Sequence, residues 1–238
     1  MRSLIVNADD FGASRGVNRG IIEAHEHGIV TSASLMVDGA AATEAAEFAC
    51  GATDMGLGLH VELQRWRRGV PPRRGAALSA AGVRRHARRE LQRQLERFRL
   101  LVGREPTHLD SHQHRHTSPL VQPLFEQKTR ELGIPLRRTP LGVRFCGDFY
   151  GHDGRGRPDP DAITVPALIQ LLEQISEGVT ELGCHPGYAN DLNDWYRVER
   201  EREVRVLCDP RIRAAVGQLG ITLMSFGEVM QLRSSRVL

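Results

Sequence analysis

The sequence predicts an α/β fold in which mostly parallel strands form a complete or irregular (β/α) barrel. Short apolar, β-branched runs alternate along the chain with helical stretches, which is the pattern of repeated βαβ units. Seven such runs can be recognised, close to the eight strands of a closed barrel, and 238 residues suit that fold. The chain contains neither GxGxxG nor GxxxxGK[ST], so a doubly wound open sheet is the less favoured alternative.

The expected strands are apolar runs that end in polar residues or in glycine-rich turns. In chain order they are Leu4–Val6, Ile29–Val37, Met55–Leu63, Thr107–His114, Ile134–Arg138, Val179–His185 and Ile221–Phe226. The expected helices show apolar residues at helical spacing, as Val17, Ile21 and Ala24 do. These helices are Gly16–His27, Asp38–Cys50, Val83–Leu101, Leu120–Leu132, Val165–Ile175 and Val198–Leu219, the last broken near Pro210.

We expect residues 1–238 to form a single domain with an inserted loop and helix at about 65–104. The loop, Arg65–Gly82, breaks the periodicity with prolines, glycines and arginines. It is either a substrate-contacting loop or a solvated excursion, and the sequence favours neither. Only Trp66 and Phe98 accompany the many arginines of 65–104, too few aromatic residues for a nucleic-acid surface. We therefore expect a solvated helix face there and no nucleic-acid partner.

The composition excludes several classes of protein. A hydrophobic fraction of 40% and a charged fraction of 26% rule out a disordered or fibrous chain. No apolar run reaches the ~18 residues of a membrane span, and MRSLIVNADD lacks the features of a signal peptide. The four cysteines are far apart and form no CxxC pair, which predicts reduced thiols. Together these observations predict a cytoplasmic protein.

Acidic residues and histidines gather where the expected strands end. They are Asp9, Asp10, His60, Asp110, His112, His114, His116 and His185. In a parallel barrel the carboxyl ends of the strands meet on one face, and barrel enzymes carry their active sites there. We therefore expect these side chains to surround a single site.

The adjacent acids Asp9 and Asp10 fit such a site. Neighbouring residues on a strand point to opposite sides, but a turn at the strand end can bring both carboxylates to one pocket. A cation beside them keeps both ionised, so that one carboxylate binds a metal while the other holds or deprotonates a water. The alternative is that Asp10 or Ser14 caps the following helix. The histidines at the other strand ends favour the site.

His60 and the fourth strand extend this pattern. Two flanking glycines leave space beside His60, although a lone histidine in an apolar run is more often a packed side chain. Alternation places Asp110, His112 and His114 on one side of their strand, where a buried Asp110 must be paired or orient a ligand. Asp10, His60 and His112 together would offer one carboxylate and two imidazoles, a donor set that suits zinc and other divalent metals.

Several blocks of sequence occur in a characteristic order: LIVNADDFG, GVNRGIIEAHEHGIVTSASLMV, GLGLHVEL, PTHLDSHQHRH, ELGCHPGY and CDPRIRAAVGQLGITLMSF. In these blocks the chain resembles the YdjC-like carbohydrate deacetylase family (the ChbG/HpnK type). The resemblance implies an irregular TIM-like barrel and hydrolysis of the acetyl group of an N-acetylated sugar with one divalent metal ion, Zn²⁺ or Mg²⁺. Arg115 departs from the family's usual apolar residue, and the Arg65–Gly82 loop has no pattern to align, so the sugar is not identified.

The resemblance also implies roles for individual residues. Asp10, His60 and His112 take the metal positions, Asp9 that of the catalytic base and His185 that of the acid. Amide hydrolysis needs an activated water and a proton for the leaving amine, and a histidine protonated near pH 7 can supply that proton. The N-acetylated sugar or oligosaccharide is the expected partner, and a homodimer is left open.

Three other functions use the same residue types. A phosphoesterase on the same barrel would usually bind two or three metals and would recruit His108, His114 or His116. A metal-dependent oxygenase would use a carboxylate and a histidine two positions apart, as Asp110 and His112 are. A basic sugar- or nucleic-acid-binding barrel is the non-enzymatic alternative.

Overall fold

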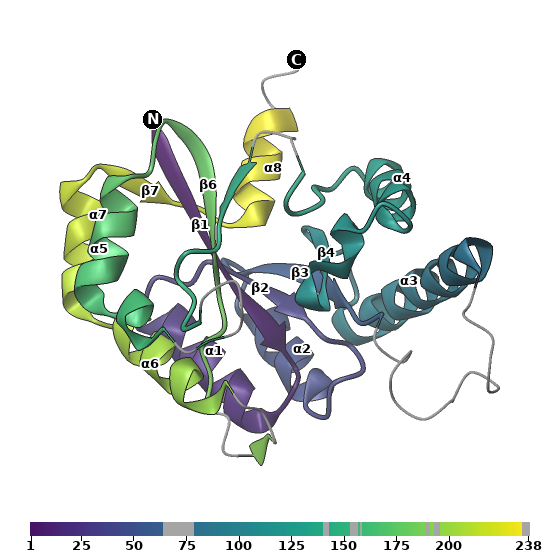
Figure 1. Cartoon of the computed structure of the whole chain (residues 1–238), viewed down its shortest axis with the longest axis horizontal. Coiled ribbons are helices and arrows are strands. Elements are labelled where there is room, and N and C mark those ends of the chain that lie inside the picture. The colour runs from purple at the N-terminus through teal and green to yellow at the C-terminus, as the bar shows by residue number, and fades with distance from the viewer. Residues whose placement is uncertain are drawn as a thin grey trace.

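The computed structural model describes residues 1–63, 79–139, 143–152, 157, 159–188, 191–192 and 196–234. In these residues seven parallel strands form one sheet, which confirms the α/β class (Figure 1). The strands are β1 (Arg2–Phe11), β2 (Ser32–Leu35), β3 (Gly56–Val61), β4 (Leu109–Ser111), β5 (Val143–Cys146), β6 (Gly178–Cys184) and β7 (Ile221–Leu223).

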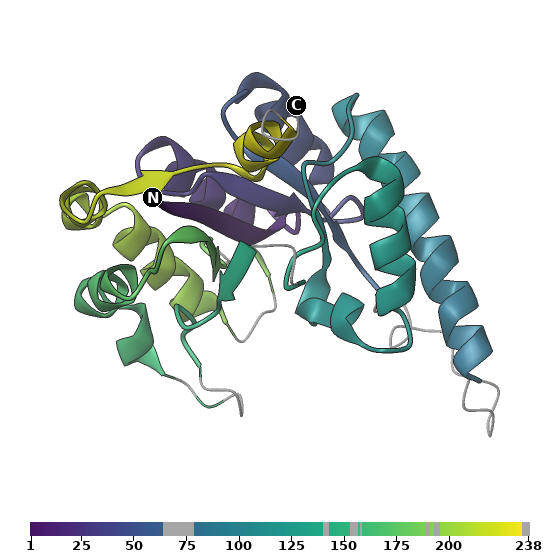
Figure 2. The same cartoon turned by 90° about the horizontal axis from the view of Figure 1, so that it is seen from above.

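β1 is the central strand and has neighbours along both edges. β6 pairs with it from Arg2 to Ala8 along one edge. Along the other edge β7 pairs with Arg2–Leu4 and β2 with the part that begins at Asn7, so two strands share this edge end to end. The full order is β4-β3-β2-β1-β6-β5 with β7 beside β1. The sheet curls as an irregular TIM-like barrel whose terminal strands are β4 and β5 (Figure 2).

Helices surround the sheet, as expected for βαβ units (Figures 1 and 2). Neighbouring helices pack in pairs along the outside: α1 on α6, α2 on α3 and α5 on α7. The α-helices are α1 (Arg15–Glu26), α2 (Ala42–Gly51), α3 (Ala80–Val102), α4 (Gln122–Leu132), α5 (Val165–Glu173), α6 (Arg197–Leu207), α7 (Pro210–Gln218) and α8 (Phe226–Ser234). Two 3₁₀ turns, η2 (His112–Thr117) and η3 (Pro160–Ile163), lie between them.

The two ends of the sheet are covered differently. At the amino ends of the strands, α8 follows β7, and the Phe226 amide donates to Ser32 Oγ at the start of β2. At the carboxyl ends, α1 approaches the segment that follows β6 so closely that a Cβ at Gly20 would lie 2.4 Å from Gly187 Cα. This close approach fixes the segment that carries His185.

The structure corrects two of the expected strands. Thr107–His114 is a strand only over Leu109–Ser111, because Gln113 and His114 take left-handed backbone angles and turn the chain into η2. The expected strand Ile134–Arg138 forms only a single bridge, between Leu136 and Leu109. The fifth strand is instead β5, an edge strand with a charged residue in its middle that hides it in the sequence.

The break predicted near Pro210 is confirmed, since α6 ends at Leu207 and Asp209 caps α7. Of the expected insertion at 65–104, residues 65–78 lie outside the described part. The helix that follows is α3, which begins at its cap Ser79 and ends at the left-handed Gly103. None of the described helices is long and apolar enough to cross a membrane.

Candidate active site

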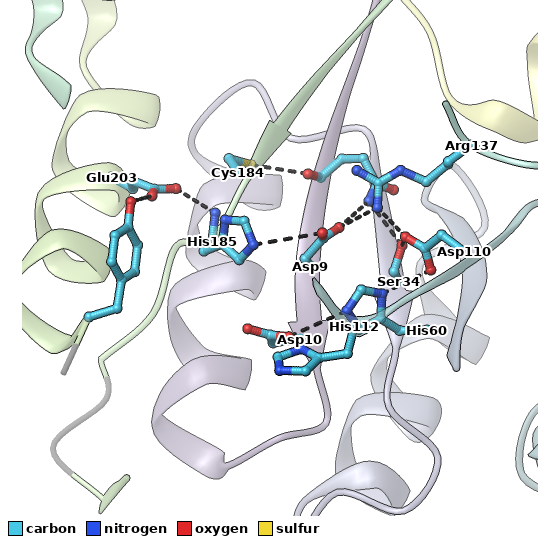
Figure 3. Close-up of polar contacts among 12 residues, drawn as sticks. Asp9, Asp10, Ser34, His60, Asp110, His112, Arg137, Cys184, His185 and Glu203 are labelled. Atoms are coloured by element: carbon cyan, nitrogen blue, oxygen red, sulfur yellow. Dashed lines mark hydrogen bonds and ion pairs between the residues drawn. The ribbon is translucent and has the colours of Figure 1, made fainter. Parts of the chain in front are cut away.

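The structure brings the five predicted site residues together at the carboxyl ends of the strands (Figure 3). Asp9 and Asp10 end β1, His60 lies near the end of β3, His112 directly follows β4 and His185 directly follows β6. Asp9, Asp10 and His60 are buried, and the His112 and His185 side chains are partly exposed. The predicted convergence of distant strand ends is therefore found.

A backbone irregularity explains how two adjacent carboxylates reach one pocket. Asp10 has a φ of +67°, a left-handed angle that aspartate tolerates better than most residues. The register between β1 and β2 shifts between Ala8 and Phe11, as in a β-bulge, which re-aims side chains. Ser14, not Asp10, caps α1 by accepting from the Val17 amide. Asp10 is thus available to the site.

Asp10, His60 and His112 form a candidate metal site. One ligand atom from each can be chosen so that all three lie within 4.8 Å of one another. His60 Nε2 lies 3.5 Å and His112 Nδ1 3.1 Å from Asp10 Oδ1. One carboxylate oxygen and two imidazole nitrogens converging on one point are a donor set that fits a divalent ion and leaves further positions open for water.

Asp110 orients His60 within this site. Its Oδ1 accepts from His60 Nδ1 at 2.8 Å, which turns Nε2 toward Asp10. A histidine that binds a metal usually donates its other ring N–H to such a carboxylate. Asp9, His60 and Asp110 form a second close trio. Because Arg137 donates to both carboxylates of that trio, we favour the first set.

Arg137 is the main residue that the sequence did not single out. Its side chain is completely buried and ion-paired with Asp9, at 2.6 Å, as well as with Asp110 and Glu181. Burial is the largest single influence and would raise the pKa of Asp9, but Arg137 together with His60 and His185 outweighs it and holds that pKa below its usual value. Arg137 lay in an expected strand, and the abundance of arginine in this chain gave it no distinctive signal.

A second arginine, Arg200 on α6, holds the other acid. Its Nη2 donates to Asp10 Oδ2 at 2.6 Å, while Oδ1 of the same carboxylate faces the two histidines. Burial opposes ionisation of Asp10, yet Arg200 and the hydrogen bonds from His112 and His60 keep its pKa well below the ordinary value. Both acids are therefore carboxylates at neutral pH.

His185 faces Asp9 from the opposite side of the pocket (Figure 3). Its Nε2 lies 3.7 Å from Asp9 Oδ2, and its backbone N–H donates to Glu203 at 2.5 Å. Burial lowers the pKa of His185 to about 4, although Asp9 and Asp10 act in the opposite direction. The expectation of a histidine protonated near pH 7 thus differs from the structure, where desolvation keeps the imidazole neutral.

The other histidines of this region have different surroundings. His108 bonds Ser34 and Thr107 through its two ring nitrogens, and it fills the space that Gly58 leaves free. His116 likewise bonds the Ser111 hydroxyl and a backbone carbonyl. Neither has a ring nitrogen left for a metal, so neither can supply a ligand for the additional metals of the phosphoesterase arrangement. The predicted grouping of Asp110, His112 and His114 on one strand face is wrong, because the chain turns at His112.

Residues 3–218 match the model of the YdjC-like protein family. The chain belongs to this family. The "Carbohydrate deacetylase" of Geobacillus stearothermophilus is 39% identical to this YdjC-like protein, with 97% of this chain and 99% of the relative covered. The "Chitooligosaccharide deacetylase" of Serratia marcescens is 35% identical, with 95% and 98% covered.

Solved structures share the fold of this YdjC-like protein. A protein of Enterococcus faecalis V583, to which cellobiose-phosphate cleavage is provisionally ascribed, superimposes with a TM-score of 0.78 at 27% identity and covers 96% of this chain and 98% of its own. A family 4 carbohydrate esterase of Streptomyces lividans superimposes with a TM-score of 0.57 at 13% identity, with 93% and 91% covered. This second likeness concerns the fold alone.

Proposed function

We propose that this YdjC-like protein is a metal-dependent carbohydrate deacetylase that hydrolyses the acetamido group of an N-acetylated sugar. The observation that carries the proposal is the convergence of Asp10, His60 and His112 beside a second carboxylate, Asp9. The names of the two curated relatives agree with an acetylated sugar as substrate. The cytoplasmic location and the single domain stay predictions from the sequence.

The donor set supports one divalent ion, Zn²⁺ or Mg²⁺, held by Asp10, His60 and His112. When bound, such an ion lowers the pKa of water and polarises a carbonyl oxygen. The chain keeps its donors ready for this ion, since Asp110 fixes the His60 ring and Arg200 fixes one oxygen of Asp10. The same contacts leave His60 Nε2 and Asp10 Oδ1 directed at each other.

In this proposal Asp9 is the base and His185 the acid. Arg137 and Asn7 bind Asp9 Oδ1, so Oδ2, which faces His185, is the atom that accepts a proton from the attacking water. His185 is neutral and must gain a proton before it can protonate the leaving amine. Asp9 Oδ2, 3.7 Å from His185 Nε2, is the group placed to deliver that proton.

Acetate release tests the proposal. Metal-depleted protein is assayed with an N-acetylated chitooligosaccharide before and after addition of zinc or magnesium, and activity should appear only after addition. His60→Ala and His112→Ala should lose bound zinc, whereas His114→Ala and His116→Ala should keep it. Full activity after verified metal removal, or equal zinc loss in all four variants, would contradict the proposal.

A further inference from the structure

Among the residues that the structure describes, four that are not glycine have left-handed backbone angles, and all four lie at the site end of the sheet: Asp10, Gln113, His114 and Arg138. Such angles are strained for residues with a side chain, and strain of this kind concentrates at functional positions. The angle at Asp10 brings its carboxylate to the histidines. The consecutive pair Gln113 and His114 has no part in the metal site, so its strain calls for another reason.

Of the two strained residues, His114 and not Gln113 is the one whose side chain is directed into the protein. The Gln113 side chain is exposed and bonds Arg115 two residues on, a contact that any surface turn can make. The His114 ring instead packs edge-on against Phe145, with centroids 5.4 Å apart and 73° between the ring planes. Phe145 belongs to β5, which is the opposite terminal strand of the sheet. His114 therefore reaches from the end of β4 across to β5.

Through Phe145, His114 borders the residues that hold the Asp9 carboxylate. Phe145, the contact of His114, has the Arg137 guanidinium 5.7 Å from its ring centroid, and Arg137 is bonded to Asp9. The His114 imidazole has two ring nitrogens, each of which can take part in a hydrogen bond.

The His114 imidazole differs from those of its neighbours His108 and His116, whose ring nitrogens are all hydrogen-bonded. Its Nδ1 is enclosed and has no hydrogen-bond partner among the described residues. A buried polar atom without a partner is unfavourable in the protein by itself, and a bound ligand can relieve it. His114 as a whole is only partly buried, so a small shift of its ring can present this nitrogen to a ligand.

We propose that His114 is a substrate-binding residue, whose imidazole hydrogen-bonds to the acetamido sugar held beside Asp9. The inference rests on the proposed deacetylase function and deepens it, because it names a contact to the sugar that is separate from the metal ligands. The strained turn is retained because it delivers this ring to the sugar.

Two glycine variants test the inference as a matched pair. Gln113→Gly and His114→Gly relieve the same kind of backbone strain, and only the second removes the imidazole. We expect both to keep or raise the Tm, by about 2–4 °C at most for a chain of this size. Gln113→Gly should keep the wild-type KM for an N-acetylated chitooligosaccharide. His114→Gly should raise KM about tenfold, the loss typical of one hydrogen bond to a ligand.

Zinc binding and a conservative variant separate substrate contact from a structural role. The zinc affinity of both glycine variants, measured by calorimetry, should stay within about twofold of wild type, since losing a group that orients a metal ligand weakens metal binding by at least about tenfold. His114→Asn tolerates the left-handed angle and keeps a donor and an acceptor, so it should recover part of the lost KM. An unchanged KM in His114→Gly, an equal loss in Gln113→Gly, or lost zinc in His114→Gly would overturn the inference.

Measuring sugar binding in addition to acetate release separates the test of His114 from the test of the deacetylase function. A wild-type protein that binds the chitooligosaccharide without releasing acetate would refute the deacetylase, while its affinity still compares the two glycine variants. A wild-type protein that neither binds nor hydrolyses the sugar would refute both proposals.

Discussion

The two ends of the sheet bury different kinds of side chain, charged at the carboxyl end and apolar at the amino end. At the carboxyl end, Asp9, Asp110 and Arg137 lie in the interior as charged groups that need one another. At the amino end, Phe226 and Val229 of α8 pack on Ile5 in a small apolar cluster. Apolar burial contributes stability directly, whereas buried ion pairs at best offset their own desolvation. The apolar amino end thus contributes stability to the fold. The charged residues at the carboxyl end contribute little stability, so their presence there reflects a role in the chemistry of the site.

The largest effect that can test this contrast is on turnover. Asp9→Asn should keep bound zinc and lower kcat by about 10²–10⁴-fold, because the base is lost while the ligands remain. Asp10→Asn should lose zinc affinity and activity together, since it replaces a charged ligand. Zinc content and kcat measured on both variants decide the assignment. Zinc lost from Asp9→Asn but kept in Asp10→Asn would reverse the two roles.

The apolar end should fail through stability instead. Phe226 is 1% exposed, and Phe226→Ala should lower the free energy of unfolding by about 3–5 kcal/mol. The folded fraction should keep nearly wild-type kcat and zinc affinity, because Phe226 contacts none of the proposed ligands and reaches the site only through His108, on which its ring stacks. Urea unfolding and the kinetics of the folded fraction measure the two effects. If Phe226→Ala had normal stability and a reduced kcat, the amino end of the sheet would not be the stabilising end, and the contrast between the two ends would be wrong.

A smaller effect is expected at Asp110, the carboxylate that accepts a hydrogen bond from the proposed metal ligand His60. Asp110→Asn should weaken zinc binding by about 10–100-fold, the usual result when a metal-bound histidine loses the carboxylate that orients it. Asp209→Asn, which alters a surface helix cap far from the site, is the matched control and should bind zinc normally. Calorimetric titration distinguishes them. Complete loss of zinc in Asp110→Asn would make Asp110 a ligand rather than an orienting group.

The smallest effect is the response of stability to acid. Burial lowers the pKa of His108 to about 3, from about 6.5 in an unfolded chain. Between these values the unfolded chain binds a proton that the folded protein excludes, so stability falls as pH drops below about 6.5. Wild type should lose on the order of 1–2 kcal/mol through this group between pH 7 and 5. Urea midpoints of His108→Gln should change less with pH, and an identical slope would refute the assignment.

The sequence was informative where a charged residue interrupts an apolar strand. Asp9, Asp10 and His60 could be assigned to one site because their strands must end at one face of a parallel sheet. Arg137 and Arg200 could not be assigned to the site in this way. Arg137 contacts Asp9 and Arg200 contacts Asp10, and each pair is separated by more than a hundred positions in the sequence. Nothing in their local sequence distinguishes them from the many surface arginines.

The limits of the fold prediction have similarly local causes. β5 was missed because an edge strand with one exposed, charged residue does not show a continuous apolar run. The strand before His112 was drawn too long, because alternating residues predict extended backbone whatever angles the tertiary structure imposes. At Gln113 and His114 the backbone takes left-handed angles that these residue types rarely adopt. A conformation that goes against the local preference of the residues cannot be predicted from the local sequence pattern.

The shared edge of β1 also constrains when the protein can fold. The first part of that edge, Arg2–Leu4, is completed by β7, more than two hundred residues later in the chain, and the other edge by β6. During synthesis, which proceeds at about 5–20 residues per second, β1 therefore waits for tens of seconds with an apolar edge unpaired. Its final pairing is of the long-range kind that forms slowly and exposes the growing chain to aggregation. The carboxylates of β1 acquire Arg200 as a partner only late in this interval, so a nascent chain carries the ligands before it carries the site.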